Sequence, residues 1–157
     1  MKESRNVESF SLDHTKVRAP YVRLAGVKSG PKGDEVSKYD IRFCQPNEEA
    51  IPTGGIHTLE HLMAEYLRDE LDGVIDLSPM GCRTGFYLTL FGTPGEERIA
   101  RAMRAVLAKV SEWPSSEAVP GVDPVMCGNW ADHDLESARL WARRWVEGFD
   151  RKGWSPF

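Results

Sequence analysis

Two histidines and a glutamate lie together at residues 57–61, in the order His-x-x-Glu-His. Residues four apart share one face of a helix, so the rings of His57 and His61 can reach a single metal ion. Glu60 flanks that face and is a candidate proton carrier. Such residues can also be ordinary polar groups at the edge of a core, but the ordered pattern favours a metal site.

The residues around this motif have the hydrophobic period of an amphipathic helix. The apolar positions are Ile56, Leu59, Leu62, Met63, Tyr66, Leu67 and Leu71. Thr53 or Gly54 is expected to cap the start of this helix, and Gly73 marks its far end. The metal-site pattern is therefore expected on a helix that packs its apolar face against a core.

Length and composition limit the classes of protein to consider. A chain of 157 residues with mixed composition is expected to form one domain. The formal net charge is −4 and the charges are interspersed, so no nucleic-acid partner is expected. The polar start lacks a signal-peptide core and no apolar run could span a bilayer, which predicts a cytoplasmic protein without membrane contact. Three widely spaced cysteines argue for reduced thiols rather than a disulfide framework.

Alternating apolar and polar residues predict strands on both sides of the helix. Residues 21–27 and 36–45 are expected to form an antiparallel hairpin with one apolar face, and residues 86–91 a further strand. On the second of these strands, Arg42 is a solvated residue or an anion clamp, and the solvated interpretation is favoured because charged residues are mostly exposed. Two later helices are expected at 96–113 and from about 135 to Gly148, the last one capped by Asp132 or Asp134.

Two of the cysteines are candidates for chemistry. Cys82 lies in a loop between Gly81 and Gly85, which can leave its thiol accessible, so a reactive thiol is as good an interpretation as a packing one. Cys127 is the strongest distant candidate for a third metal ligand, because thiolate suits zinc and iron(II). A His/His/Cys set leaves one position open, which fits either metal-assisted hydrolysis or proton abstraction next to a polarised carbonyl.

A series of motifs follows in order along residues 6–148. They are Val7-Glu8-Ser9-Phe10 with Leu12-Asp13-His14, Ala19-Pro20-Tyr21-Val22-Arg23, Asp40-Ile41-Arg42-Phe43 with Gln45-Pro46-Asn47, His57-Thr58-Leu59-Glu60-His61, the run from Asp76 to Gly85, and Cys127-Gly128 with His133-Asp134-Leu135. Together they resemble the S-ribosylhomocysteine lyases of the LuxS family, far more specifically than any one motif could. The resemblance implies an α+β fold, with α-helices packed against an antiparallel β-sheet. We expect a single domain over residues 1–157, with loosely ordered ends at 1–6 and 149–157.

The resemblance also implies an activity, a cofactor and a quaternary structure. The activity is cleavage of S-ribosylhomocysteine to homocysteine and 4,5-dihydroxy-2,3-pentanedione, the precursor of the autoinducer-2 quorum-sensing signal, as a step of the methyl cycle. The cofactor is one iron(II) per subunit, with zinc often found after purification. The enzymes are homodimers with two sites at the interface, where the N-terminal arm of one subunit reaches the site of the other.

By position, the resemblance assigns a role to ten residues. His57, His61 and Cys127 match the metal ligands, and Cys82 and Glu60 match the two acid/base residues. Ser9, Phe10 and His14 on the arm, together with Arg42 and Asp76, match residues that bind the substrate.

The sequence leaves two other functions open. A metallohydrolase of the inverted His-x-x-Glu-His kind shares the helix motif, but takes a glutamate as its third ligand. A non-catalytic metal-binding sensor would keep the scaffold without the activity. The identity of the third ligand separates the first alternative from the lyase, and turnover separates the second.

Overall fold

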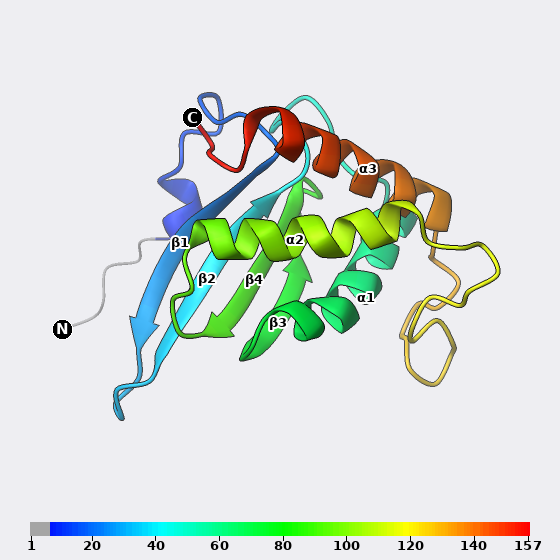
Figure 1. Cartoon of the computed structure of the whole chain (residues 1–157), viewed down its shortest axis with the longest axis horizontal. Helices are drawn as coiled ribbons and strands as arrows, with labels where there is room; N and C mark the ends of the chain where they lie inside the picture. Colours follow the sequence, from blue (N-terminus) through cyan, green and yellow to red (C-terminus); the bar gives the residue numbers. More distant parts are fainter. Residues whose placement is uncertain (1–6) are drawn as a thin grey trace.

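Four strands form one antiparallel sheet in the order β1-β2-β4-β3, and three α-helices accompany it (Figure 1). The computed structural model describes residues 7–157. The elements are the 3₁₀ helix η1 (Glu8–Phe10), β1 (Tyr21–Ser29), β2 (Glu35–Arg42), α1 (Thr53–Glu70), β3 (Val74–Pro79), β4 (Gly85–Phe91), α2 (Glu96–Ser111) and α3 (Leu135–Lys152). The predicted α+β class, with an antiparallel sheet and packed helices, is confirmed. None of the helices in the described part has the length and hydrophobicity that a membrane crossing requires.

The helices cover the apolar face of the sheet. Alternate residues of paired strands point to the same side, and on this side Tyr39 pairs with Leu88 and Ile41 with Phe86. All four side chains are buried in one core with the apolar stripes of the helices. The indole Nε1 of Trp145 on α3 donates a hydrogen bond to the Arg42 carbonyl at 3.1 Å, which ties the last helix to β2. The core therefore fixes α1, which carries the metal-site motif, relative to the sheet.

Part of the opposite face of the hairpin, around Asp40 and Arg42, is buried as well, which the sequence did not predict. Arg42 is only 1% exposed and Asp40 is fully buried, so the expectation of a solvated Arg42 is wrong. The carboxylate of Asp40 accepts hydrogen bonds from Arg42, from the Tyr21 hydroxyl and from Arg23. Arg23 in turn pairs with Glu8 of η1. Buried charges are tolerated when they are paired and hydrogen-bonded, and this network supplies both conditions.

The helix ends differ in part from the predictions. Pro52 precedes α1 and no side chain caps it, so neither Thr53 nor Gly54 is its cap. Asp134 does cap α3, and its side chain accepts a hydrogen bond from the Ser137 amide at 2.9 Å. This helix runs past Gly148 to Lys152.

Of the two ends expected to be loosely ordered, only the C-terminal one lies in the described part of the chain. Residues 1–6 lie outside the described part of the chain. Residues 149–152 belong to α3, and the carbonyls of Trp154 and Pro156 accept hydrogen bonds from the amides of Val22 and Arg18. Beyond α3, the segment that contains Trp154 is thus held beside the start of β1.

Gly85 allows β4 to approach β2 closely. A Cβ atom at this position would lie 2.2 Å from the carbonyl oxygen of Ile41 and 3.0 Å from the Cα of Arg42, and backbone atoms cannot rotate away. We expect Gly85→Ala to lower the free energy of unfolding by about 1–3 kcal/mol in urea titrations. Gly26→Ala in β1 is the matched control, because its Cβ would meet nothing within 4 Å. Equal losses in the two variants would contradict the close-approach argument.

Candidate metal centre and thiol pocket

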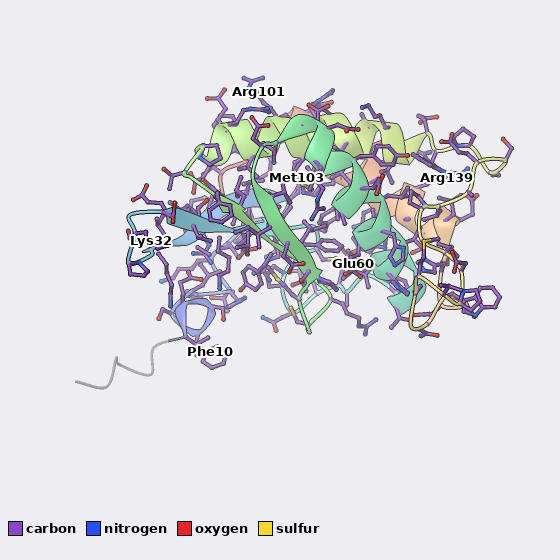
Figure 2. The ribbon with its side chains drawn as sticks, turned by 90° about the horizontal axis from the view of Figure 1, so that it is seen from below. Phe10, Lys32, Glu60, Arg101, Met103 and Arg139 are labelled. Atoms are coloured by element: carbon purple, nitrogen blue, oxygen red, sulfur yellow. The ribbon has the colours of Figure 1, made fainter. Side chains whose placement is uncertain are left out.

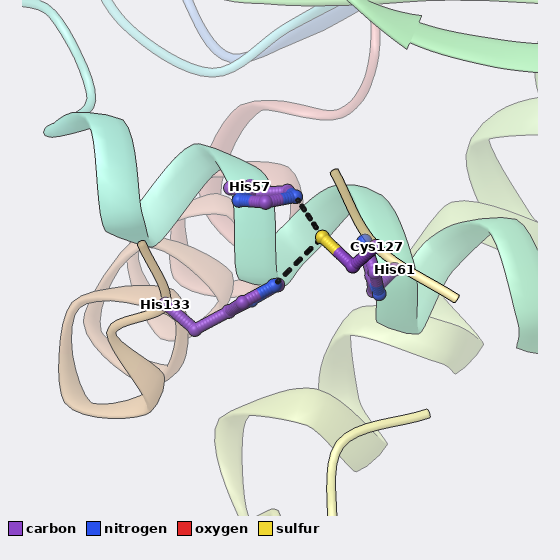
Figure 3. A group of neighbouring side chains, drawn as sticks. All are labelled: His57, His61, Cys127 and His133. Atoms are coloured by element: carbon purple, nitrogen blue, oxygen red, sulfur yellow. Dashed lines mark hydrogen bonds between the residues drawn. The ribbon is translucent and has the colours of Figure 1, made fainter. Parts of the chain in front are cut away.

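Four side chains meet between α1 and the loop that leads to α3 (Figure 3). His57 and His61 come from α1, and Cys127 and His133 come from the loop. Their candidate ligand atoms all lie within 4.8 Å of one another. The sulfur of Cys127 is 3.4 Å from Nε2 of His57 and 3.9 Å from Nε2 of His133. Ligands about 2.3 Å (sulfur) and 2.0 Å (nitrogen) from a tetrahedral ion are roughly 3.5 Å apart, so the spacing fits a metal ion.

Hydrogen bonds from the two α1 histidines fix which ring nitrogen faces the centre. Nδ1 of His57 lies 2.8 Å from the Asp132 carbonyl, and Nδ1 of His61 lies 2.8 Å from the Pro120 carbonyl. A carbonyl oxygen only accepts, so both Nδ1 atoms carry the proton. In the neutral form of each ring, Nε2 then keeps a free lone pair, which is how metal-binding imidazoles are oriented by their surroundings.

The same reasoning applies to His133, through the hydroxyl of Thr58. This hydroxyl lies 2.8 Å from the Gly54 carbonyl, to which it must donate its proton, and it accepts from the Asp134 amide at 2.9 Å. It can therefore only accept from Nδ1 of His133, at 3.1 Å. Burial, and then the neighbouring rings of His57 and His61, lower the pKa of His133 to about 4, so the ring is neutral at pH 7. Nε2 of His133 is thus a third free imidazole nitrogen at the centre.

Cys82 lies in a second pocket, on the far side of β2 and β4 from the helices. Its exposed thiol shares this pocket with residues from the N-terminal arm, β2, β4 and its own loop, namely Ser9, Phe10, His14, Arg42, Met80, Gly81 and Tyr87. The loop turns sharply after Cys82, where Arg83 has a left-handed backbone with φ of 59°. A non-glycine residue in this region is uncommon and is often found at functional sites.

The two sets of residues line separate pockets. Glu60 lines an open pocket with His61, Gly121 and Met126, and that lining has no residue in common with the lining of the Cys82 pocket. Figure 2 shows Phe10 below η1 and Glu60 on α1, well apart from each other. In the described part of the chain, the metal-binding group therefore lies beside Glu60, whereas the Cys82 thiol lies beside the N-terminal arm in a separate pocket.

Comparisons with known proteins identify the family of this chain. The model of the family described as S-Ribosylhomocysteinase (LuxS) matches residues 7–153. The chain belongs to this family. Relatives named S-ribosylhomocysteine lyase are 60% identical in Thermus thermophilus (88% of this chain and 87% of the relative), 57% in Deinococcus radiodurans (91% and 89%) and 55% in Lactobacillus acidophilus (90% and 90%).

For this LuxS-family chain, most of the predicted site residues fall into the two groups. His57, His61 and Cys127 gather in one metal-binding group, as predicted. No glutamate belongs to that group among the described residues, which removes the main support for an inverted metallohydrolase. Asp76 lines neither pocket; it is exposed on β3 and accepts a hydrogen bond from the Ser78 hydroxyl.

Two residues near these sites were not assigned a role from the sequence. The sequence carries His133 only within the motif His133-Asp134-Leu135, and the fold brings its ring into the metal-binding group. Thr84 was part of the Cys82 loop without a role, yet its hydroxyl lies 3.0 Å from the Cys82 sulfur. Both positions gain meaning only when the loop geometry is known.

His133 is expected to strengthen metal binding. Its ring stacks on His57 with the centroids 3.9 Å apart, and its free Nε2 faces the same centre. We expect His133→Ala to weaken zinc binding by about 10–100-fold in competition with a chromophoric chelator. His14→Ala is the control, because His14 lies in the other pocket and its loss should leave zinc affinity unchanged. Wild-type affinity in His133→Ala would show that this ring only fills space.

Proposed function

We propose that this protein is an S-ribosylhomocysteine lyase, which cleaves S-ribosylhomocysteine to homocysteine and 4,5-dihydroxy-2,3-pentanedione. The observation that carries the proposal is the 55–60% identity, over about nine tenths of both chains, to relatives named for this activity. The product pentanedione is the precursor of autoinducer-2, and homocysteine returns to the methyl cycle. We place the enzyme in the cytoplasm, where these metabolites arise and where its three thiols stay reduced.

The residues of the metal centre fit an iron(II) or zinc cofactor. His57, His61 and Cys127 would hold one ion per subunit, as imidazole and thiolate ligands suit both metals. We propose iron(II) as the metal in the cell and expect zinc after aerobic purification. When bound, the ion would polarise the carbonyl oxygen of the open-chain sugar, so that a proton on the next carbon becomes acidic.

Cys82 and Glu60 are proposed to move the protons. The Cys82 thiolate removes the proton at C2 and returns it at C1, while the hydroxyl proton moves from O2 to O1, so the carbonyl shifts by one carbon. A second such transfer brings the carbonyl to C3, and the proton at C4 then becomes acidic. Glu60 removes that proton, and homocysteine leaves from C5 as a thiolate by β-elimination. The enol that remains takes up a proton at C5 and loses its hydroxyl proton, which gives the pentanedione. Glu60 borders the metal centre beside His61, which supports its part in the last step.

The remaining predicted residues are proposed to bind the substrate. Ser9, Phe10 and His14 surround the Cys82 thiol together with Arg42, whose guanidinium is charged and reaches the same pocket. Burial lowers the pKa of Arg42, but the hydrogen bonds and negative charge of Asp40 more than offset this effect and raise it. Asp76, exposed on β3, is available to bind a hydroxyl of the sugar.

The two separate pockets support a homodimeric site. Because the arm lines the pocket of its own Cys82, the arm, Arg42 and Cys82 would enter a shared site together. The metal centre and Glu60 would come from the partner subunit. Exposed apolar side chains flank both pockets, with Phe10 84% exposed beside Cys82 and Met126 69% exposed beside Glu60. Large exposed apolar side chains at two rims are typical of surfaces that become buried on association.

Anaerobic turnover tests the proposed function. Protein reconstituted with iron(II) is incubated with S-ribosylhomocysteine, and released homocysteine is measured with a thiol reagent after the enzyme is denatured and removed. We expect homocysteine to accumulate with the metal-loaded protein and not with the metal-free protein. No release from protein shown to hold one metal per chain would reject the lyase and favour a non-catalytic sensor.

A further inference from the structure

A chain of hydrogen bonds leads from a buried carboxylate to the exposed thiol of Cys82. Asp40 accepts from Nε of Arg42 at 3.1 Å and from Nη2 at 2.8 Å, which fixes the plane of the guanidinium. The remaining nitrogen, Nη1, donates to the hydroxyl oxygen of Thr84 at 2.7 Å. That oxygen lies 3.0 Å from the sulfur of Cys82. Thr84, only 6% exposed, therefore stands between a positive charge and the reactive sulfur.

The direction of these hydrogen bonds follows from the groups involved. A guanidinium has no lone pair to offer, so the Thr84 oxygen can only accept from Arg42. The hydroxyl keeps its own proton for another partner, and the Cys82 sulfur is in reach. A hydroxyl polarised by a cation is a stronger donor than a free one, and an ionised sulfur is a better acceptor than a thiol. The geometry thus allows the Thr84 hydroxyl to donate to the sulfur of Cys82 while it accepts from Arg42.

We propose that Thr84 is a positioning residue that relays the charge of Arg42 to Cys82 and stabilises its thiolate. The inference rests on the proposed function only in taking Cys82 as the group that removes a proton. Thr84 touches no substrate in this scheme and acts through Cys82. Asp40 supports this relay indirectly, because its two hydrogen bonds with Arg42 leave Nη1 of Arg42 directed at Thr84.

The other titratable groups of the pocket have to be separated from this effect. Arg42, His14 and Tyr87 line the pocket with Cys82. Arg42 stays charged at all accessible pH values. Burial raises the pKa of Tyr87, so it stays neutral where a thiol ionises. The imidazole of His14 also lines the pocket, so the measurements are made in a His14→Ala background as well as in the wild type.

The test is the rate at which iodoacetamide alkylates Cys82, followed by mass spectrometry of the Cys82 peptide in zinc-loaded protein. Only the thiolate reacts, so the rate reports its fraction. We expect Thr84→Val to react about 10–100-fold more slowly than the wild type at pH 7. The rates should converge at high pH, where the thiol is ionised in either protein. Thr84→Ser, which keeps the hydroxyl, should react nearly as fast as the wild type.

Two outcomes would overturn the inference. Thr84→Val could react as fast as the wild type over the whole pH range, or Thr84→Ser could be as slow as Thr84→Val. The second result would mean that the methyl group, and not the hydroxyl, matters. Thr84→Ala gives the same test should the valine variant not fold, as judged by circular dichroism and zinc content. None of these alkylation rates depends on turnover. The inference about Thr84 can therefore fail while the protein is a lyase, and it can hold while the protein is not one.

Discussion

Cys82→Ala is expected to abolish measurable release of homocysteine from S-ribosylhomocysteine. The thiolate is proposed to carry both proton transfers that precede elimination, and loss of a general acid/base group lowers turnover by about 10²–10⁴-fold. The exposed thiol gives the physical reason, since an accessible sulfur can reach a proton on a substrate carbon. Turnover is measured anaerobically with iron(II)-loaded protein, as for the wild type.

The variant needs two controls. Its metal content should equal that of the wild type, because Cys82 is not among the residues of the metal-binding group. Cys44→Ala is the matched cysteine control; Cys44 is buried in the core, and burial raises the pKa of its thiol to about 12. The folded fraction of that variant should keep its activity. Full turnover by Cys82→Ala would remove this residue from the mechanism.

Local sequence patterns predicted the scaffold because they depend on neighbours in the chain. The apolar stripe around His57 and His61 specified α1, and strand alternation specified the hairpin and β4. The same alternation did not predict that Arg42 is buried. Its burial depends on Asp40 beside it, on Arg23 of β1 and on Glu8 of η1, and a period-two pattern carries no information about such tertiary partners.

The metal-binding group, too, could be predicted from local spacing only where its residues are neighbours in the sequence. Helical spacing alone places His57 and His61 on one face, so the sequence was sufficient for those two ligands. Cys127 and His133 lie in a loop, and their approach depends on contacts such as that of the Thr58 hydroxyl with His133. Thiolate chemistry made Cys127 the strongest candidate for the third ligand and the family resemblance agreed, whereas His133 is placed at the centre only by the folded loop. The division of the site into two pockets was likewise invisible in the order of the motifs.

The division into two pockets leads to a second prediction, that two variants inactive on their own regain lyase activity when they form mixed dimers. Cys82→Ala lacks the proposed base, and His57→Ala lacks a ligand of the metal centre. If each site takes Cys82 from one subunit and the metal centre from the other, a mixed dimer holds one doubly altered site and one intact site. Random assortment makes half of the dimers mixed, so co-expressed variants should regain about a quarter of wild-type specific activity.

The choice of these two variants excludes recovery through an intermediate that one variant releases and the other completes. Neither can carry out the first proton transfer, so neither can hand a released intermediate to the other. Preformed dimers of each variant, mixed without subunit exchange, should stay inactive and serve as the control. No recovery in verified mixed dimers would place Cys82 and the metal centre of one site in the same subunit. The separate linings of the two pockets, with Phe10 exposed at one rim and Met126 at the other, lead us to expect recovery.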